Sequence, residues 1–146
     1  TVRLPGDLEG LLRLARASFR REGIRLEYSR ETQTAVWVRR GELGHVLLTL
    51  LANAADSVRQ RPAGREVRVR FRAEQGQAVL EVGDNGAGVD PRLGERIFEP
   101  GTSGKGSTGL GLYLARAFAE RSGGSLELVS RSEGGLFRLR LPAAPE

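Results

Sequence analysis

The chain has 146 residues, 39% hydrophobic and 28% charged, which is enough for one domain with a buried core; we expect a single domain over residues 1–146. No apolar run approaches the roughly 18 to 20 residues that span a bilayer, and the absence of cysteine together with a single histidine excludes disulfides, thiolate metal sites and multi-histidine metal centres. The net charge of +5 arises from arginines interleaved with acidic residues along the whole chain, which favours solvated surfaces over a nucleic-acid-binding face.

The first predicted element is a helix between Asp7 and Gly23. Asp7 is expected to be its N-cap, and Gly23 is expected to end it. The apolar residues that recur at helical spacing between them are Leu8, Leu11, Leu12, Ala15 and Phe19.

Short β-prone segments lie on both sides of a second, longer helix. Residues 24–28 and 34–38 are predicted strands with a polar turn between them. Residues 67–71 and 78–82 are rich in valine and predict a hairpin through Ala-Glu-Gln-Gly. Three aromatic residues flanked by arginine are expected in the core: Phe19, Trp37 and Phe71.

The second helix, over residues 42–60, is the clearest of the predicted elements. On a helical wheel its predicted buried face consists of Leu43, Val46, Leu47, Leu50, Leu51, Ala54 and Val58. A second stripe, Thr49, Asn53, Asp56 and Gln60, lies along one margin of that face. An asparagine there needs hydrogen-bond partners. The helix alone favours a loop backbone as the partner of Asn53, with a pocket holding a ligand or hydrated metal as the alternative, and we expect His45 to be partly exposed.

The second hairpin strand leads into the turn Gly83-Asp-Asn-Gly-Ala-Gly-Val. Glycines there allow positive φ or close approach to a ligand. A carboxylate at the end of a strand, as on Asp84, is a good acceptor for an exocyclic amine such as that of adenine. The alternative is an Asp-Asn-Gly turn that satisfies its own backbone, and the turn alone does not separate the two.

A long glycine-rich connection, residues 83–108, contains at most a helical turn near residues 91–95. Connections of this length inside a compact domain are functional lids or disordered segments. A helix over residues 109–122 and a closing hairpin of residues 125–130 and 135–141 are predicted to follow. The whole pattern predicts an α/β (α+β) two-layer sandwich, with a mixed, mostly antiparallel sheet covered by helices on one face.

The glycine-rich stretch around Lys105, the only lysine of the chain, resembles several phosphate-binding loops. A Walker A loop is excluded because Glu99 stands in place of its first glycine and Gly106 follows the lysine. Residues 104–109 match Gly-x-Gly-x-x-Gly, but a long loop precedes them in place of the strand that a dinucleotide fold needs. A flexible loop with one cation remains, leading into a helix whose free amides at residues 108–112 can bind phosphate oxygens; the alternative is a mobile surface loop.

Four motifs in a fixed order are more specific than any one of them. The segments LLANAADS (50–57), DNGAGV (84–89), IFEPG (97–101) and GSTGLGL (106–112) resemble the N, G1, F and G2 boxes of the histidine kinase catalytic domain, within the GHKL ATPase superfamily. The closing GSLEL and GGLFRLRLP segments also resemble that family's final hairpin. The resemblance implies a Bergerat-type fold that binds ATP and Mg²⁺ between the asparagine helix and a mobile lid.

The same resemblance assigns roles to individual residues. Asn53 would ligate Mg²⁺ and, with Lys105, would act in catalysis; Asp84 would bind the adenine amino group. Gly86 and Gly88 would admit the base, and Phe98 would anchor the start of the lid. The full set of implied nucleotide-binding residues is Asn53, Asp56, Asp84, Gly86, Gly88, Val89, Phe98, Lys105, Gly106, Ser107, Thr108, Gly109, Leu110, Gly111 and Leu112.

The implied reaction is transfer of the γ-phosphoryl group to a histidine on a separate dimerisation and phosphoacceptor segment in a two-component system. A response regulator would act downstream, and we expect no nucleic-acid or membrane contact by this domain. The sequence begins at Thr1 without a methionine, so we expect it to be a fragment of a longer parent protein. We expect a cytoplasmic location and a homodimeric parent protein that can be membrane-anchored.

Two positions depart from the family pattern. Thr49 replaces the asparagine of many histidine kinases and the catalytic glutamate of ATP-hydrolysing relatives, which disfavours a hydrolase. His45 does not resemble the His-Glu phosphoacceptor box, so the acceptor must lie on another segment or protein. A nucleotide-binding regulatory module without transfer activity and an anti-sigma-factor-type serine kinase are the alternatives.

Overall fold

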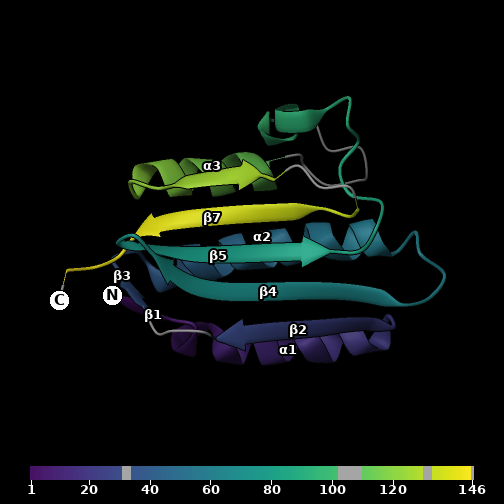
Figure 1. Ribbon diagram of the computed structural model, residues 1–146, viewed down its shortest axis with the longest axis horizontal. Helices are drawn as coiled ribbons and strands as arrows, with labels where there is room; N and C mark the ends of the chain where they lie inside the picture. Colours follow the sequence, from purple (N-terminus) through teal and green to yellow (C-terminus); the bar gives the residue numbers. More distant parts are fainter. Residues whose placement is uncertain (31–33, 102–109, 130–132, 146) are drawn as a thin grey trace.

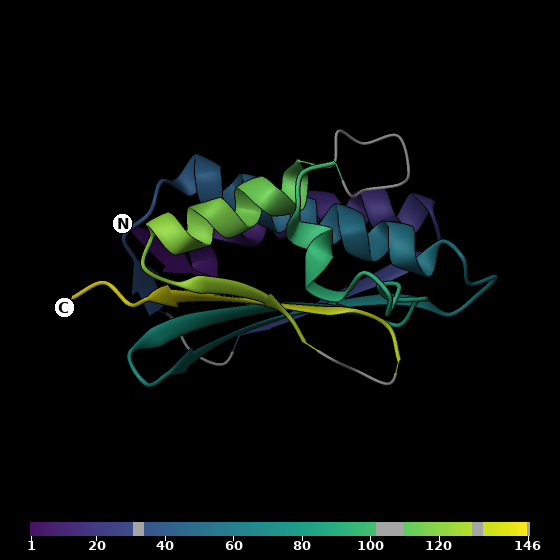
Figure 2. The same cartoon turned by 90° about the horizontal axis from the view of Figure 1, so that it is seen from above.

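The computed structural model describes residues 1–30, 34–101, 110–129 and 133–145. In this part of the chain, three α-helices cover one face of a five-stranded sheet, and the opposite face is bare (Figures 1 and 2). The helices are α1 (Glu9–Arg21), α2 (Arg40–Val58) and α3 (Gly111–Arg121). The sheet has the order β2 (Ile24–Arg30), β4 (Arg65–Glu74), β5 (Gln77–Asp84), β7 (Leu136–Pro142), β6 (Ser125–Leu128). No helix among the described residues is both long and apolar enough to cross a membrane.

The sheet is mixed, as predicted. β2 runs parallel to β4, and α2 makes the crossover between them, as a parallel connection requires. The other neighbours are antiparallel. The β4–β5 hairpin turns at Gln75 and Gly76, whose φ angles of 50° and 77° match the right-handed twist of the flanking strands. This topology brings the end of β5 beside the start of β7, and α2 packs against β5 and β4.

The core lies between the sheet and the helices. Every residue of the predicted buried face of α2 is buried, and Ala55 joins them. In the strands, alternate residues face this layer; in β4 they are Val67, Val69 and Phe71. The expected two-layer sandwich is therefore the observed architecture.

The bare face of the sheet carries charges. Glu81 on β5 is only 5% exposed, because arginines of both neighbouring strands cover it. Its carboxylate accepts from Arg72 on β4 and from Arg138 on β7, each at 2.6 Å. Burial raises the pKa of Glu81, but the hydrogen bonds and charges of the two guanidinium groups together lower it by more. The pKa of Glu81 therefore lies below its ordinary value.

The amino-terminal region differs from the prediction. A strand that the sequence did not predict, β1 (Val2–Leu4), pairs with β3 (Thr34–Val36) in a separate two-stranded sheet. The prediction of Asp7 as an N-cap is wrong. Asp7 lies within a 3-10 turn, η1 (Gly6–Leu8), and its carboxylate instead accepts from the backbone N–H of Arg3 at 2.8 Å.

Smaller differences concern single residues and element ends. Trp37 is 70% exposed because β3 already ends at Val36, so the expectation that it is a core residue is wrong, whereas Phe19 and Phe71 are buried as expected. The helical turn predicted near residues 91–95 lies slightly later, as the 3-10 helix η2 (Gly94–Phe98). His45 is exposed, as expected.

Candidate functional site

A pocket of about 330 Å³ opens where α2, the turn after β5 and the η2 region meet. α2 contributes polar side chains, and the segments after β5 contribute mostly apolar ones. The residues that line it are Asn53, Asp56, Ser57, Gln60, Asp84, Gly88, Val89, Asp90, Leu93, Ile97, Leu112, Gly135 and Phe137. The pocket thus unites residues of all four sequence motifs with Gly135 and Phe137, which lie at the start of the second strand of the closing hairpin.

Asp84 is the most tightly held polar side chain of this pocket and is 8% exposed. Its Oδ1 atom accepts a hydrogen bond from the Ser57 hydroxyl at 2.7 Å. Oδ1 also accepts from the backbone N–H groups of Gly86 at 2.9 Å and Gly135 at 3.2 Å. No donor among the described residues reaches Oδ2, and no buried side-chain oxygen there lacks a partner, so Oδ2 is accessible. Asp84 therefore hydrogen-bonds its own turn, as one interpretation expected, and its accessible Oδ2 leaves the interpretation as a ligand acceptor a prediction.

The two glycines of the turn allow it to lie against its neighbours. A Cβ atom on Gly86 would stand 2.2 Å from the backbone carbonyl carbon of Ser57. Gly88 has a φ of +73°, and a Cβ there would meet the carbonyl oxygen of Gly134 at 2.5 Å. Only glycine fits either position, because a side chain would collide with backbone on both sides. Gly88 lines the pocket, whereas Gly86 packs behind it against α2.

The polar stripe of α2 is divided between pocket and solvent. Asn53 is half-buried and lines the pocket, and no described residue hydrogen-bonds its side chain, so the loop-backbone partner favoured from the helix alone is not formed within this part of the chain. Asp56 also lines the pocket and pairs with Arg59. Thr49 does not line it, and its hydroxyl donates to the carbonyl oxygen of His45 at 3.0 Å.

The oxygen atoms of Asn53 and Asp56 suit a hard cation such as Mg²⁺, which prefers oxygen ligands. The described residues contain no group of three or more histidine, cysteine, aspartate or glutamate side chains that could enclose a metal. Mg²⁺ commonly keeps several waters and takes its other ligands from substrate phosphates. The residues present therefore fit a magnesium ion that is shared with a phosphate-bearing ligand.

The structure describes the residues on either side of the predicted lid. Phe98 is buried beneath the pocket wall, in edge-to-face contact with Phe137 at 6.0 Å between ring centroids. Leu112 lines the pocket, and Leu110 and Gly111 lie at the start of α3. The remaining predicted residues lie outside the described part of the chain: Lys105, Gly106, Ser107, Thr108 and Gly109.

Several pocket residues were not among the predicted site residues. Ser57 stands four residues after Asn53, so helical spacing already placed both on one face. The sequence around Ser57 did not indicate its hydrogen-bond partners, because they lie in the turn after β5. Gly135 and Phe137 come from β7 and its approach, about fifty residues after Asp84, and only the sheet pairing brings them to the pocket.

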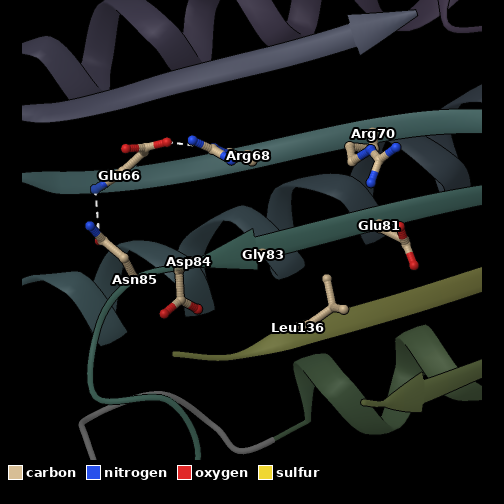
Figure 3. Close-up of a pocket in the computed structure, with 8 residues that line it drawn as sticks. All are labelled: Glu66, Arg68, Arg70, Glu81, Gly83, Asp84, Asn85 and Leu136. Atoms are coloured by element: carbon tan, nitrogen blue, oxygen red, sulfur yellow. Dashed lines mark hydrogen bonds and ion pairs between the residues drawn. The ribbon is translucent and has the colours of Figure 1, made fainter. Parts of the chain in front are cut away.

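A second depression, of about 350 Å³, lies on the bare face of the sheet (Figure 3). Gly83 leaves it open, and charged side chains of β4 and β5 surround it, among them the ion pair of Glu66 with Arg68. Beside it, Asn85 accepts from the Glu66 N–H at 2.9 Å and donates to the Gly64 carbonyl at 2.7 Å. Asn85 therefore fastens the turn that carries Asp84 to the start of β4.

A family model for histidine kinase-, DNA gyrase B- and HSP90-like ATPases matches residues 39–145. The chain belongs to this family. The match begins just before α2 and ends after β7, so it includes every residue that lines the pocket of this ATPase-family domain.

The relatives of this ATPase-family domain are sensor proteins. The two-component sensor PprA of Pseudomonas aeruginosa is 42% identical over 147 residues, which cover 93% of this chain and 16% of PprA. The C4-dicarboxylate transport sensor protein DctB of Rhizobium meliloti is 33% identical over 140 residues, which cover 94% of this chain and 22% of DctB. The chain thus spans about a fifth of the length of these relatives.

Solved structures confirm the expected fold. The mycobacterial sensor histidine kinase MprB superposes with a TM-score of 0.82 at 26% identity, and the likeness covers 99% of both chains. Full-length ShkA, solved in complex with AMPPNP, gives a TM-score of 0.80 at 25% identity over 96% of this chain and 31% of ShkA. The resemblance to histidine kinase catalytic domains, stated from the motifs, is therefore confirmed.

Proposed function

We propose that this domain binds ATP with Mg²⁺ and donates the γ-phosphoryl group to a histidine on a separate dimerisation and phosphoacceptor segment, in two-component signal transduction. The observation that carries the proposal is the Asp84 carboxylate, which has three donors on Oδ1 and none from the described residues on Oδ2, in the pocket that also contains Asn53. The sensor kinases among the relatives support it, as does the AMPPNP complex of ShkA.

In this proposal the adenine amino group donates to Oδ2 of Asp84, and apolar walls flank the ring. Val89, Ile97 and Leu112 are the side chains suited to that contact, because they are apolar and line the pocket. A glycine-bordered turn and a carboxylate held as an acceptor favour a base with an N–H donor and disfavour one with a carbonyl oxygen in that place.

The phosphates lie toward Asn53 and the start of α3. Asn53, with Asp56 near it, would hold Mg²⁺, and the ion would supply positive charge that neutralises the charge developing on the phosphates. The amides at the amino terminus of α3 add a partial positive charge that favours phosphate oxygens. Lys105 and residues 106–109 are proposed to close over the phosphates, and Phe98 to anchor the start of that segment.

The decisive substitution is Asp84→Asn. Because three donors surround the Oδ1 position, the asparagine carbonyl must take that position, and its NH₂ group then occupies the position of Oδ2. A donor would face the donor of adenine, so we expect the affinity for ATP to fall by about 30-fold or more. Inosine triphosphate, which has a carbonyl oxygen in place of the amino group, should bind this variant better than it binds the parent.

Isothermal titration with ATP, inosine triphosphate and Mg²⁺ measures both effects. Asp7→Asn is the matched control, because Asp7 undergoes the same chemical change in the η1 turn, outside the pocket. If Asp84→Asn binds ATP as tightly as the parent protein, the assignment of the adenine site is wrong.

A regulatory module that binds nucleotide without transfer is the second candidate, and Thr49 favours it. The Thr49 hydroxyl donates to the His45 carbonyl oxygen, and Thr49 does not line the pocket. This position therefore supplies neither an amide nor a carboxylate to the pocket. Adding candidate phosphoacceptor helices and labelled ATP separates the possibilities. Label on a histidine supports the kinase, acid-stable label on a partner's serine supports the anti-sigma-factor-type kinase, and binding without label supports the regulatory module.

A further inference from the structure

We infer that Ser57 is a positioning residue that sets the preference for a 6-aminopurine, by holding Asp84 in the orientation that presents Oδ2. The inference rests on the proposed function and deepens it. Ser57 is the penultimate residue of α2, and its hydroxyl bridges two groups of the turn after β5. It donates to Oδ1 of Asp84 at 2.7 Å and accepts from the N–H of Gly88 at 2.8 Å.

The direction of these two hydrogen bonds follows from their partners. A backbone N–H can only donate, so the Gly88 amide occupies a lone pair of the Ser57 oxygen. The single hydroxyl proton is then directed at Asp84, where Oδ1 already accepts from two amides. Three donors on one oxygen restrain the otherwise soft rotation of the carboxylate about its last bond, and Oδ2 remains the acceptor that faces a ligand.

Ser57 is the only side chain among the three donors of Oδ1, so it is the contact that substitution can remove while the chain keeps both amides. It also joins the two ends of the site. Ser57 and Asn53 are one helical turn apart on the same face of α2, and the Ser57 carbonyl accepts from the N–H of Ala87 at 3.2 Å. The hydroxyl and the carbonyl of Ser57 thereby fix the turn that carries Asp84 relative to the helix that carries Asn53.

Removing the hydroxyl has two consequences for ligand choice. The carboxylate loses one of its three restraints and can turn Oδ1 toward the pocket or bind a water there, and the Gly88 N–H loses its acceptor. A carboxylate that can rotate selects less strongly for an N–H donor. Discrimination against a purine with a carbonyl oxygen at position 6 should therefore weaken. Affinity for ATP should also fall, because the acceptor is no longer preorganised.

The test compares the affinities of Ser57→Ala and the parent protein for ATP and inosine triphosphate by isothermal titration with Mg²⁺. We expect the ratio of the two affinities to shrink by about tenfold in Ser57→Ala, chiefly through loss of ATP binding. Ser57→Thr keeps the hydroxyl and should restore most of the ratio. Ser125→Ala, at an exposed position on β6, removes a serine hydroxyl outside the pocket and should leave the ratio unchanged.

The melting temperature of each variant separates positioning from folding. A purely structural role of Ser57 would lower the melting temperature and leave the ratio of the two affinities unchanged, and that result would overturn the inference. So would equal ratios for the alanine and threonine variants. The proposed function fails separately: in that case the parent protein itself binds no ATP, whereas failure of this inference leaves ATP binding by the parent intact.

Discussion

Gly86 shows how little space separates the turn after β5 from α2. The backbone angles of Gly86 do not themselves require glycine, but the space beside it does. A Cβ there would meet the Ser57 carbonyl carbon and oxygen, both at 2.2 Å. Its own N–H donates to Asp84 at the same time. One residue therefore combines a packing constraint with a contact that orients the carboxylate of the pocket.

Gly86→Ala should reduce the affinity for ATP by tenfold or more, because α2 and the turn must move apart and the three donors of Asp84 then lose their common geometry. Titration calorimetry measures the loss. The control is Gly41→Ala in the first turn of α2, where nothing lies within 4 Å of an added Cβ. That control should bind ATP normally and gain about 0.5 to 1 kcal/mol of stability from helix propensity. Normal binding by Gly86→Ala would contradict the proposed role of this turn.

The same scale shows the limit of prediction from sequence. Asn53 and Asp84 could be proposed as site residues because each stands in a local pattern, a helical stripe and a strand end followed by glycines. Ser57 could not, because what makes it matter is a contact 27 residues away. Serine near a helix end is common, and no spacing rule distinguishes one with a buried partner.

Among the elements, η2 and α3 are joined by Arg116, which both stacks on an aromatic ring and hydrogen-bonds a carboxylate of η2. The Arg116 guanidinium of α3 lies over the ring of Phe98 at 4.0 Å and also pairs with Glu95 of η2. The opposite contact of the ring is the edge-to-face pair with Phe137 on β7. Phe98 thus fixes the segment that carries Leu93 and Ile97 into the pocket.

Phe98→Leu should therefore affect binding as well as stability. Loss of the ring should cost about 1 to 2 kcal/mol of unfolding free energy and lower the affinity for ATP several-fold, because the apolar wall of the pocket is no longer held. Phe19→Leu, on the buried face of α1 and outside the pocket, should cost a similar amount of stability and leave the affinity unchanged. Urea denaturation and calorimetry on both variants give the comparison; equal affinities for the two would remove Phe98 from the proposed site.

The elements that could be predicted were those with strong periodicity. The long helix and both hairpins were correct in type, with ends that differ by a few residues, because apolar spacing along them is regular. β1 was missed because three residues are too few to show an alternation of apolar and polar side chains. Its extended structure depends on the pairing with β3. The N-cap prediction failed because the 3-10 turn η1 runs directly into α1, so that Leu8 is the N-cap and Asp7 lies within the preceding turn.

At the scale of the whole molecule, charges rather than apolar contacts connect the strands across the bare face. Glu81 on β5 is held between Arg72 of β4 and Arg138 of β7, and Arg138 continues to Glu127 of β6 at 3.3 Å. The chain of ion pairs spans four of the five strands of the main sheet. Its central carboxylate is the one that burial would destabilise most without its partners.

Glu81→Gln should lower the free energy of unfolding by about 1 to 3 kcal/mol near neutral pH. Because the arginines keep the folded-state pKa of Glu81 below its ordinary value, the ionic contribution is complete above about pH 4.3 and is lost as the pH falls below it. The difference between parent and variant should shrink accordingly, as urea titrations at about pH 7 and about pH 3.5 would show. Glu74→Gln, at a 41%-exposed side chain, should cost less than about 1 kcal/mol at either pH. A difference that does not change with pH would mean that packing, not charge, holds Glu81.

The position of β7 between β5 and β6 has a consequence for anyone who cuts this domain from a longer protein. The four motifs all end by Leu112, so a fragment that stops there carries the complete N, G1, F and G2 boxes. It would lack the Gly135 donor to Asp84, the Phe137 contact with Phe98, and β7, the strand that pairs with β5. β5 would then become an exposed edge, open to pairing with other chains. The smallest piece that can work is therefore set by the last strand and not by the last motif.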